Sequence, residues 1–217
     1  RGSLFLAISE SSRQEGINYL GFSEEISVNI STAADSQFKP QLISNEVETD
    51  IRRKYALNNS YVMYTGGIDH RKNIEGLIRA YAILPEIIRT KHQLVVVCSI
   101  QPSDKDRLEV LAKEYKLKSG ELVLTGFVPE DDLVTLYALC KVFVFPSWHE
   151  GFGLPALEAM SCGRAVIGSD RSSVPEVIGL DDALFDSKVD QAIADKLIKV
   201  LSDDAFRSKL EKHGLKQ

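Results

Sequence analysis

The sequence has few cysteines and no long hydrophobic run, and each shortage excludes a class of protein. Its three cysteines (Cys98, Cys140 and Cys162) lie far apart and form no CxxC pair or Cys/His cluster, which argues against a zinc site or a disulfide framework. Cys98 and Cys140 end apolar runs, so we expect both to be small core residues. Apolar runs such as Leu94–Cys98 are far shorter than the roughly 18 residues of a membrane span.

The sequence also lacks a strong excess of either charge. Its 26 Lys and Arg against 31 Asp and Glu leave a net charge of −5, which makes nucleic acid an unsuitable general partner. Any bound anion must therefore be held by a local site. The N-terminus shows no signal-peptide pattern. The missing signal peptide and the absence of a disulfide pattern together predict a cytoplasmic protein. The full-length protein could associate peripherally with the inner face of the membrane.

What the sequence does contain is an alternation of short apolar runs with longer stretches of helical period, as in repeated strand–helix–strand units. Runs such as Leu94–Val97 are apolar on both faces, as is typical of parallel strands covered by crossover helices. The pattern predicts an α/β protein with a doubly wound, Rossmann-like parallel sheet. The expected strands are Phe5–Ile8, Ile26–Ile30, Tyr61–Thr65, Gln93–Ser99, Glu121–Leu124, Val142–Phe145, Ala165–Gly168 and Ala183–Phe185.

The chain divides into segments of different character. It begins abruptly with a strand pattern and stops inside a charged helical pattern, so we expect a fragment of a larger protein. Pro40 favours an extended hinge before the main sheet. The expected segments are a tag scar at 1–3, a strand–helix–strand unit at 4–36, a polar linker at 37–40, the doubly wound domain at 41–201 and a truncated terminal helix at 202–217.

Ligands of open α/β sheets bind beyond the carboxyl ends of the strands, so a binding site is expected in the loops that follow the strands. After one strand, Gly66 and Gly67 allow close backbone approach, and Arg71 and Lys72 follow just before a helix. Cations are disfavoured at a helix N-terminus, and a bound phosphate would offset that cost. The alternative is a pair of solvated cations in a loop.

A second glycine-containing loop precedes the helix that follows another strand. Pro155 fits the first helical turn, which places Glu158 about one turn inside that helix. Gly151 and Gly153 can expose backbone N–H groups at the positive end of the helix dipole. Glu150 and Glu158 flank this anion site, and carboxylates there would accept hydrogen bonds from hydroxyl groups. The combination suits a nucleoside diphosphate that carries a sugar.

The segment HEGFGLPALEAMSCG, with Glu150 and Glu158 separated by seven residues and PEVIG following, resembles the retaining glycosyltransferases of the GT-B fold. The group is known as family 4 or glycosyl transferase group 1. GGIDHRKNIEGLIRAY resembles its phosphate-binding segment, and the likeness extends over nearly the whole chain. It implies that residues 41–201 bind the nucleotide-sugar donor and that 4–36 end an acceptor domain whose main body lies outside the chain.

The resemblance also implies residue roles. Arg71 and Lys72 would hold the donor diphosphate, and Glu150, the third implied catalytic residue, would contact the sugar. Glu158 would bind the ribose hydroxyls. No metal or other cofactor would be needed, because the cations and the helix dipole neutralise the leaving diphosphate. The other donor-binding positions are Gly66, Gly67, Phe127, Val128, Gly151, Phe152, Gly153 and Leu154, with Phe127 and Val128 beside the nucleobase. The family's Asn-Gly-Val-Asp-like junction is replaced here by Ser31–Asp35.

Other motifs have simpler interpretations. Gly151-x-Gly153-x-x-Ala156 fits a dinucleotide-binding pattern, but it does not follow directly on the first strand. Asp104-x-Asp106 resembles a metal-binding DxD, although acids also stabilise a helix start. His149 could act as a general base or serve in orienting and packing, and Trp148 could pack or stack on a sugar. Glu176 could be a first-turn helix acid or lie near the donor.

The predicted reaction moves a hexose from a nucleoside diphosphate to a hydroxyl of a glycan or lipid-linked acceptor, with retention of configuration. GDP-mannose is the expected donor, and a UDP-sugar is the alternative. Two other functions stay open: a GT-B-fold nucleotide-sugar epimerase, and a nucleotide-binding module without activity of its own. We expect the isolated chain to bind nucleotide without transferring sugar.

Overall fold

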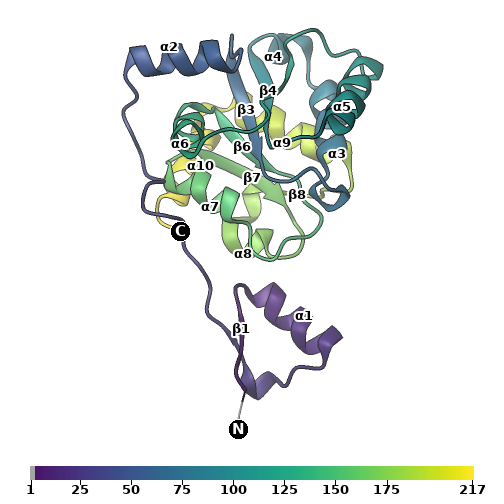
Figure 1. The fold of residues 1–217 in the computed structure, drawn as a ribbon, viewed down its shortest axis with the longest axis vertical. Helices are drawn as coiled ribbons and strands as arrows, with labels where there is room; N and C mark the ends of the chain where they lie inside the picture. The colour runs from purple at the N-terminus through teal and green to yellow at the C-terminus, as the bar shows by residue number, and fades with distance from the viewer. Residues whose placement is uncertain (1–2) are drawn as a thin grey trace.

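The computed structural model describes residues 3–217, so two of the three residues assigned to a tag scar lie outside the described part (Figure 1). Its strands form two separate sheets, and all pairs within them are parallel. The strands are β1 (Phe5–Ala7), β2 (Ser27–Asn29), β3 (Ser60–Thr65), β4 (His92–Val97), β5 (Leu122–Leu124), β6 (Val142–Phe145), β7 (Ala165–Ser169) and β8 (Leu184–Phe185). Every expected strand is confirmed, and the ends differ by at most two residues.

Helices fill the connections between these strands. The α-helices are α1 (Glu10–Leu20), α2 (Asn45–Lys54), α3 (Ile74–Ile83), α4 (Glu86–Arg89), α5 (Pro102–Glu114), α6 (Glu130–Leu139), α7 (Leu154–Ser161), α8 (Val174–Ile178), α9 (Asp190–Ser202) and α10 (Asp204–Gly214). Short 3-10 helices are η1 (Glu24–Ile26), η2 (His70–Lys72) and η3 (Asp181–Ala183). Pro129 directly precedes α6 as its N-cap residue.

The main sheet has the order β5-β4-β3-β6-β7-β8. The chain therefore runs outward from β3 to β5, returns to β6 beside β3, and continues outward to β8. Right-handed crossovers in opposite directions place their helices on opposite faces. Accordingly, α3 contacts α5 and α9, whereas α6 contacts α2 and α7. This arrangement confirms the doubly wound sheet and puts its topological switch point between β3 and β6.

The core lies on both faces of the central strands. All four residues of β6 are buried, and so are the last five residues of both β3 and β4. The three cysteines are buried and free, as the sequence indicates for Cys98 and Cys140. Such double burial explains why these strands appear in the sequence as continuous apolar runs. No helix within residues 3–217 is long and apolar enough to span a bilayer.

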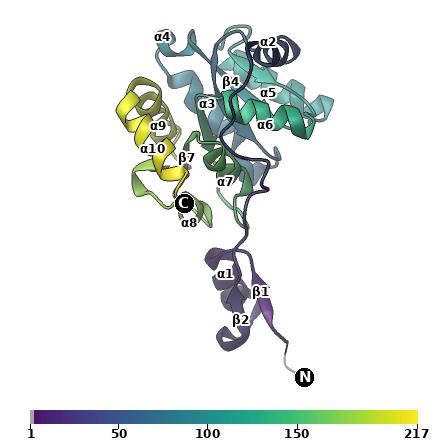
Figure 2. The ribbon, with the colours of Figure 1, turned by 90° about the vertical axis from the view of Figure 1, so that its left-hand side faces the viewer.

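The N-terminal elements β1, α1 and β2 form a small unit beside the main domain (Figures 1 and 2). An extended segment joins β2 to α2, and Phe38 within it is buried edge-on against Tyr137, with ring centroids 5.6 Å apart. The chain just before the predicted hinge at Pro40 is thus attached to the main domain through Phe38. The domain limits themselves stay predictions.

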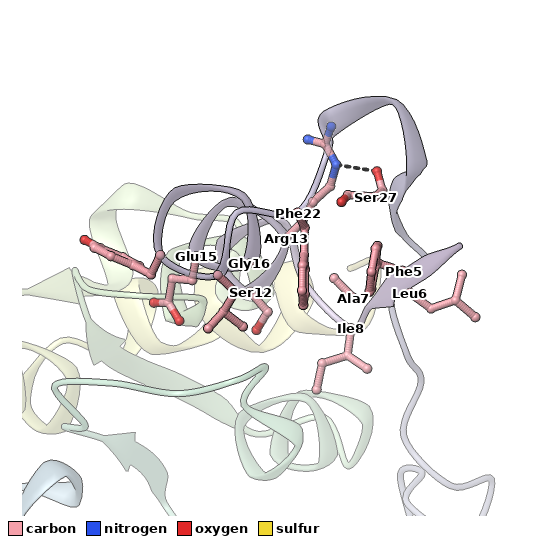
Figure 3. A pocket seen from close by; sticks show the side chains of 12 residues that line it. Phe5, Leu6, Ala7, Ile8, Ser12, Arg13, Glu15, Gly16, Phe22 and Ser27 are labelled. Carbon is pink, nitrogen blue, oxygen red and sulfur yellow. Dashed lines mark hydrogen bonds between the residues drawn. The ribbon is translucent and has the colours of Figure 1, made fainter. Parts of the chain in front are cut away.

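A groove of about 430 Å³ lies on this N-terminal unit, between β1 and α1 (Figure 3). Apolar side chains line much of it, including the stacked rings of Phe5 and Phe22, whose centroids are 4.0 Å apart. Two of its lining residues, Ser12 and Glu15, also contact the β6–α7 loop at the switch point of the main sheet.

Candidate functional site

The switch point brings together the loops that follow β3 and β6. In the β3–α3 loop, η2 carries Arg71 and Lys72, and in the β6–α7 loop lies Glu150. The backbone N–H of Trp148 donates to the carbonyl of Arg71 at 2.8 Å, which joins the two loops directly. The two regions identified separately from sequence therefore form one site.

Lys72 and Glu150 form an ion pair at the centre of this site. The Lys72 Nζ lies 2.7 and 2.8 Å from the two Glu150 carboxylate oxygens. The side chains are only 13% and 8% exposed, so the pair is largely withdrawn from water. The lysine can still donate a hydrogen bond to a phosphate, and the carboxylate can still accept one from a neighbouring hydroxyl.

Arg71 is placed differently from its neighbour. Its guanidinium is about half exposed, and its Nε lies 2.8 Å from Asp69 Oδ1. The two cations predicted to act together thus differ in exposure, since Lys72 is largely buried and Arg71 lies at the surface. Arg71 can reorient toward an incoming anion with little loss, because exposed ion pairs contribute little stability.

Asn73 fixes the loop that carries these cations. It adopts a left-handed conformation, with φ of 56°, directly after η2. Its buried Nδ2 donates to the carbonyl of Ser187 at 2.8 Å and to that of Pro146 at 3.3 Å. Gly76 leaves the space that this amide occupies, since a Cβ there would lie 2.2 Å from Asn73 Oδ1. One side chain thereby joins the loops after β3, β6 and β8.

Serine hydroxyls from the β7–α8 connection hold the carbonyls of Glu150 and Phe152. Ser172 Oγ donates to the Glu150 carbonyl at 2.7 Å, and Ser173 Oγ contacts the carbonyls of Glu150 and Phe152 at 3.0 and 2.6 Å. The Glu150 N–H donates to Ser172 Oγ at 3.1 Å. This segment is therefore rigidly supported from the β7–α8 connection.

The next four N–H groups have no such partners. Those of Gly151, Phe152, Gly153 and Leu154 donate to no acceptor in the described part of the chain. Gly153 is the N-cap residue of α7 and has φ of 119°, a conformation open to glycine but strained for other residues. Consecutive free N–H groups at a helix N-terminus form an anion-binding surface.

Glu158 lies one turn inside α7, as predicted, and its carboxylate contacts a buried tyrosine. Tyr137 Oη donates to Glu158 Oε2 at 2.8 Å and lies 3.2 Å from the Pro155 carbonyl. Burial raises the pKa of Glu158, the Tyr137 hydrogen bond lowers that pKa, and the charge of Glu130 raises it. Burial also raises the pKa of Tyr137 well above its ordinary value, so the phenol remains the donor.

The raised pKa of Glu158 predicts a pH dependence of stability. The folded state holds its proton to higher pH than the unfolded state, so Glu158 favours folding below its ordinary pKa of 4.5 and loses that contribution as pH rises through the raised value. We expect the unfolding free energy of the wild type, relative to Glu158→Gln, to fall as pH rises above 4.5. Urea denaturation of both proteins across pH 4–8 measures this difference. A stability difference between wild type and Glu158→Gln that does not change with pH would contradict this prediction. Glu114→Gln, at an exposed position, is the control.

The remaining predicted positions surround these groups at different distances along the sheet edge. Gly66, with φ of 142°, directly follows β3 and donates to the Val97 carbonyl at 3.3 Å. The carbonyl of Gly67 accepts from Tyr64 Oη at 2.6 Å. Phe127 is 76% exposed and lies with Val128 after β5, at the edge of the sheet. No described contact joins these two residues to the Lys72–Glu150 pair.

Three residues with open interpretations contact neighbouring segments. Trp148 Nε1 donates to the Ser187 carbonyl at 3.0 Å, and its ring meets His70 edge-on, which favours packing. His149 Nε2 lies 2.9 Å from Glu15 Oε1 on α1. Both oxygens of the Glu176 carboxylate accept from the Glu10 N–H at 2.9 Å. Two of these three residues therefore contact the N-terminal unit.

Sequence reasoning missed several supporting residues: Ser9, Ser12, Asn73, Tyr137, Ser172 and Ser173. For Asn73 a signal was present, because asparagine between a turn and a helix is a common left-handed residue. The serines gave no signal, since their partners are carbonyls distant in sequence. Asp104 lies in the first turn of α5, as its helix-start interpretation required. Within residues 3–217 no group of three His, Cys, Asp or Glu side chains is arranged to hold a metal.

The segment that carries these loops matches a known protein family. The family model described as "Glycosyl transferases group 1" matches residues 47–217. The chain belongs to this family. The glycosyltransferase resemblance noted from the two motifs is thereby confirmed, and it covers both loops of the site.

Individual relatives agree with this assignment. The chain is 42% identical, over 217 residues, to "Serotype-specific mannosyltransferase WbdA" of Escherichia coli, all of this chain aligning with 27% of that protein. It is 36% identical to "O-antigen chain mannosyltransferase B" of Escherichia coli, over 99% of this chain and 55% of the relative. Its fold matches Anabaena HepE, solved in complex with UDP-glucose, at a TM-score of 0.85 and 21% identity, over 99% of this chain and 58% of that one. The chain thus spans between a quarter and about half of the length of these curated relatives.

Proposed function

We propose that this chain is the donor-binding part of a retaining hexosyltransferase in glycan or surface-polysaccharide synthesis. The observation that carries the proposal is the buried Lys72–Glu150 pair beside four free N–H groups at the switch point. Lysine and backbone N–H groups bind diphosphate oxygens, and a carboxylate accepts from sugar hydroxyls. The names of the two mannosyltransferase relatives support mannose as the sugar and GDP-mannose as the donor, with a UDP-sugar as the alternative. They do not favour the epimerase.

In the proposed reaction, negative charge develops on the departing diphosphate. The bond between the anomeric carbon and the diphosphate breaks, and its electron pair leaves with the diphosphate. The acceptor oxygen bonds to the same face of that carbon, and its proton passes to a diphosphate oxygen. Lys72, Arg71 and the N-terminus of α7 stabilise the departing charge by fixed electrostatics, which is most effective away from water. Glu158 would hold the ribose, and Phe127 and Val128 would adjoin the base.

The residues that bind the acceptor would lie in the part of the enzyme that the longer relatives have and this chain does not. We therefore expect residues 1–217 to bind the donor without transferring sugar. The glycan or lipid-linked acceptor and a position at the inner face of the membrane are parts of this proposal. Sugar transfer from donor to acceptor by the isolated chain would contradict the proposal that acceptor binding needs the rest of the enzyme.

Nucleotide binding tests the proposal directly. Thermal shift and calorimetric titration with GDP, UDP and ADP, and with their sugar conjugates, identify the ligand, because a ligand at 100 times its Kd stabilises by about 2.7 kcal/mol. We expect Arg71→Ala to weaken binding by about 1–2 kcal/mol, a roughly 5- to 30-fold rise in Kd, while stability stays unchanged. Arg53→Ala is the matched control, since Arg53 is also exposed and paired with a nearby aspartate. If no nucleotide binds, the proposal is wrong.

A further inference from the structure

The first turn of α1 lies against the loop that carries the free N–H groups. Ser9 Oγ and Ser12 Oγ donate to the same acceptor, the Gly151 carbonyl, at 2.6 and 2.8 Å. The hydrogen-bonded partners are separated by 142 and 139 residues in sequence. A Cβ at Gly151 would already approach Ile8 Cδ1 to 3.6 Å, so the two segments are in close contact. Ser9 and Ser12 both precede residues 47–217, the part that the family model matches.

These two hydroxyls determine which way one peptide group points. In a trans peptide, the carbonyl and the following N–H point in opposite directions. Because α1 holds the Gly151 carbonyl, the Phe152 N–H must face away from α1. Ser173 has the same effect on the Phe152 carbonyl and the Gly153 N–H. Two separate segments of the chain thus orient consecutive N–H groups of the proposed donor site.

A carboxylate of the main domain holds α1 in this position. Both Glu176 carboxylate oxygens accept from the Glu10 N–H at 2.9 Å, and Oε2 also accepts from the Ser11 N–H at 3.3 Å. Asn29 Nδ2, on β2, donates to Glu176 Oε1 at 3.2 Å. A negative charge at a helix N-terminus is stabilised by the helix dipole. In Figure 3, Ser12 and Glu15 leave one side of α1, while Arg13 leaves another and donates through Nε to the Ser27 carbonyl at 2.8 Å.

We propose that Ser9 and Ser12 are positioning residues of the donor site, kept in place by Glu176. They hold the Gly151 carbonyl and so keep the Phe152 N–H directed toward the diphosphate and sugar of the donor. The N-terminal unit thereby contributes to donor affinity without touching the donor. This inference rests on the proposed function, since it requires that the Gly151–Leu154 backbone bind that ligand.

Ser12→Ala is the decisive variant, because Ser9 Oγ also accepts from the Ser12 N–H as the N-cap of α1. We expect Ser12→Ala to raise the Kd for GDP-mannose about two- to tenfold, the range for one neutral hydrogen bond. Ser12→Thr retains the hydroxyl and should restore affinity. Ser11→Ala is the matched control, since Ser11 neighbours Ser12 on α1 and its hydroxyl has no hydrogen-bond partner in residues 3–217. Titration calorimetry on the 217-residue chain measures all four proteins, with UDP-glucose replacing GDP-mannose if only uridine nucleotides bind the wild type.

The size of the ligand separates positioning from a general structural effect. Guanosine lacks the diphosphate and the transferred sugar, which are the groups that the N–H groups would bind. Its affinity should therefore be equal in wild type and Ser12→Ala. A loss for both ligands, or for neither, overturns the inference. Failure of the wild type to bind any nucleotide overturns the proposed function as well. Normal wild-type binding with an unchanged Ser12→Ala refutes the positioning role alone.

Glu176→Gln tests the second half of the inference. It replaces the charged acceptor at the N-terminus of α1, so the amide protons of residues 10–12 should exchange faster with solvent, and the Kd for GDP-mannose should rise as in Ser12→Ala. Glu176→Asp should recover part of both effects. Asp181→Asn, an exposed carboxylate of η3, is the control and should change neither. Unchanged exchange in Glu176→Gln would show that this carboxylate does not hold α1.

Discussion

Replacing Lys72 by methionine should lower the free energy of unfolding by about 3–5 kcal/mol and abolish most donor binding. Methionine keeps the apolar stem and removes the charge, which leaves the 8%-exposed Glu150 carboxylate without its cation. An unpaired charge at a buried position is costly, and removing one partner of such a pair has effects of this size. The lost contact to the diphosphate should weaken binding by about 1.5–3 kcal/mol, a roughly 10- to 150-fold rise in Kd.

A double variant separates these two effects. In Lys72→Met/Glu150→Gln both charges are absent, so stability should return to within about 1 kcal/mol of the wild type, since a neutral replacement of both partners has a small cost. Donor binding should stay weak. Urea denaturation and calorimetry measure the two quantities, with Lys188→Met as an exposed control. An unchanged Kd in the double variant would exclude Lys72 and Glu150 from the donor site.

The second large effect is expected at Asn73. Asn73→Ala removes the Nδ2 donor from two carbonyls, those of Pro146 and Ser187, and unsatisfied buried groups cost about 1–3 kcal/mol each. It also puts alanine at φ of 56°, which adds about 1–2 kcal/mol. We expect a total loss of at least about 3 kcal/mol. Because three loops lose their common attachment, the affinity for nucleotide should fall as well.

Two further variants at this position distinguish hydrogen bonding from backbone strain. Asn73→Gly has no left-handed strain, so it should be more stable than Asn73→Ala by about 1–2 kcal/mol while remaining below the wild type. Asn73→Asp should resemble Asn73→Gly or be worse, since it places a carboxylate beside two carbonyls. Asn59→Ala, which removes an exposed amide bonded to the Thr90 carbonyl, should cost less than about 1 kcal/mol. Chemical denaturation checks this order, and equal stability of the alanine and glycine variants would contradict it.

The candidate site was largely predictable where residues act through their own loop. Glycines before a helix, a proline in its first turn and cations beside an N-terminus have local physical meanings, so Gly153, Pro155 and Lys72 were identified without the fold. Supporting residues such as Tyr137 and Asn73 were not. Their function comes from partners on other elements, and the pattern of one element carries no information about its neighbours' identity.

By itself, the sequence determined the eight strands, the parallel doubly wound sheet and the two loops of the site. It could do so because strands buried on both faces must be continuously apolar, and because turns require particular residues. The tertiary structure alone decided that Lys72 pairs with Glu150 and that Ser12 reaches the Gly151 carbonyl. Those contacts follow from β3 and β6 being neighbours and from how α1 lies on the main domain. Strand order and packing between distant segments leave no periodic signal in the chain, so only the assembled fold reveals them.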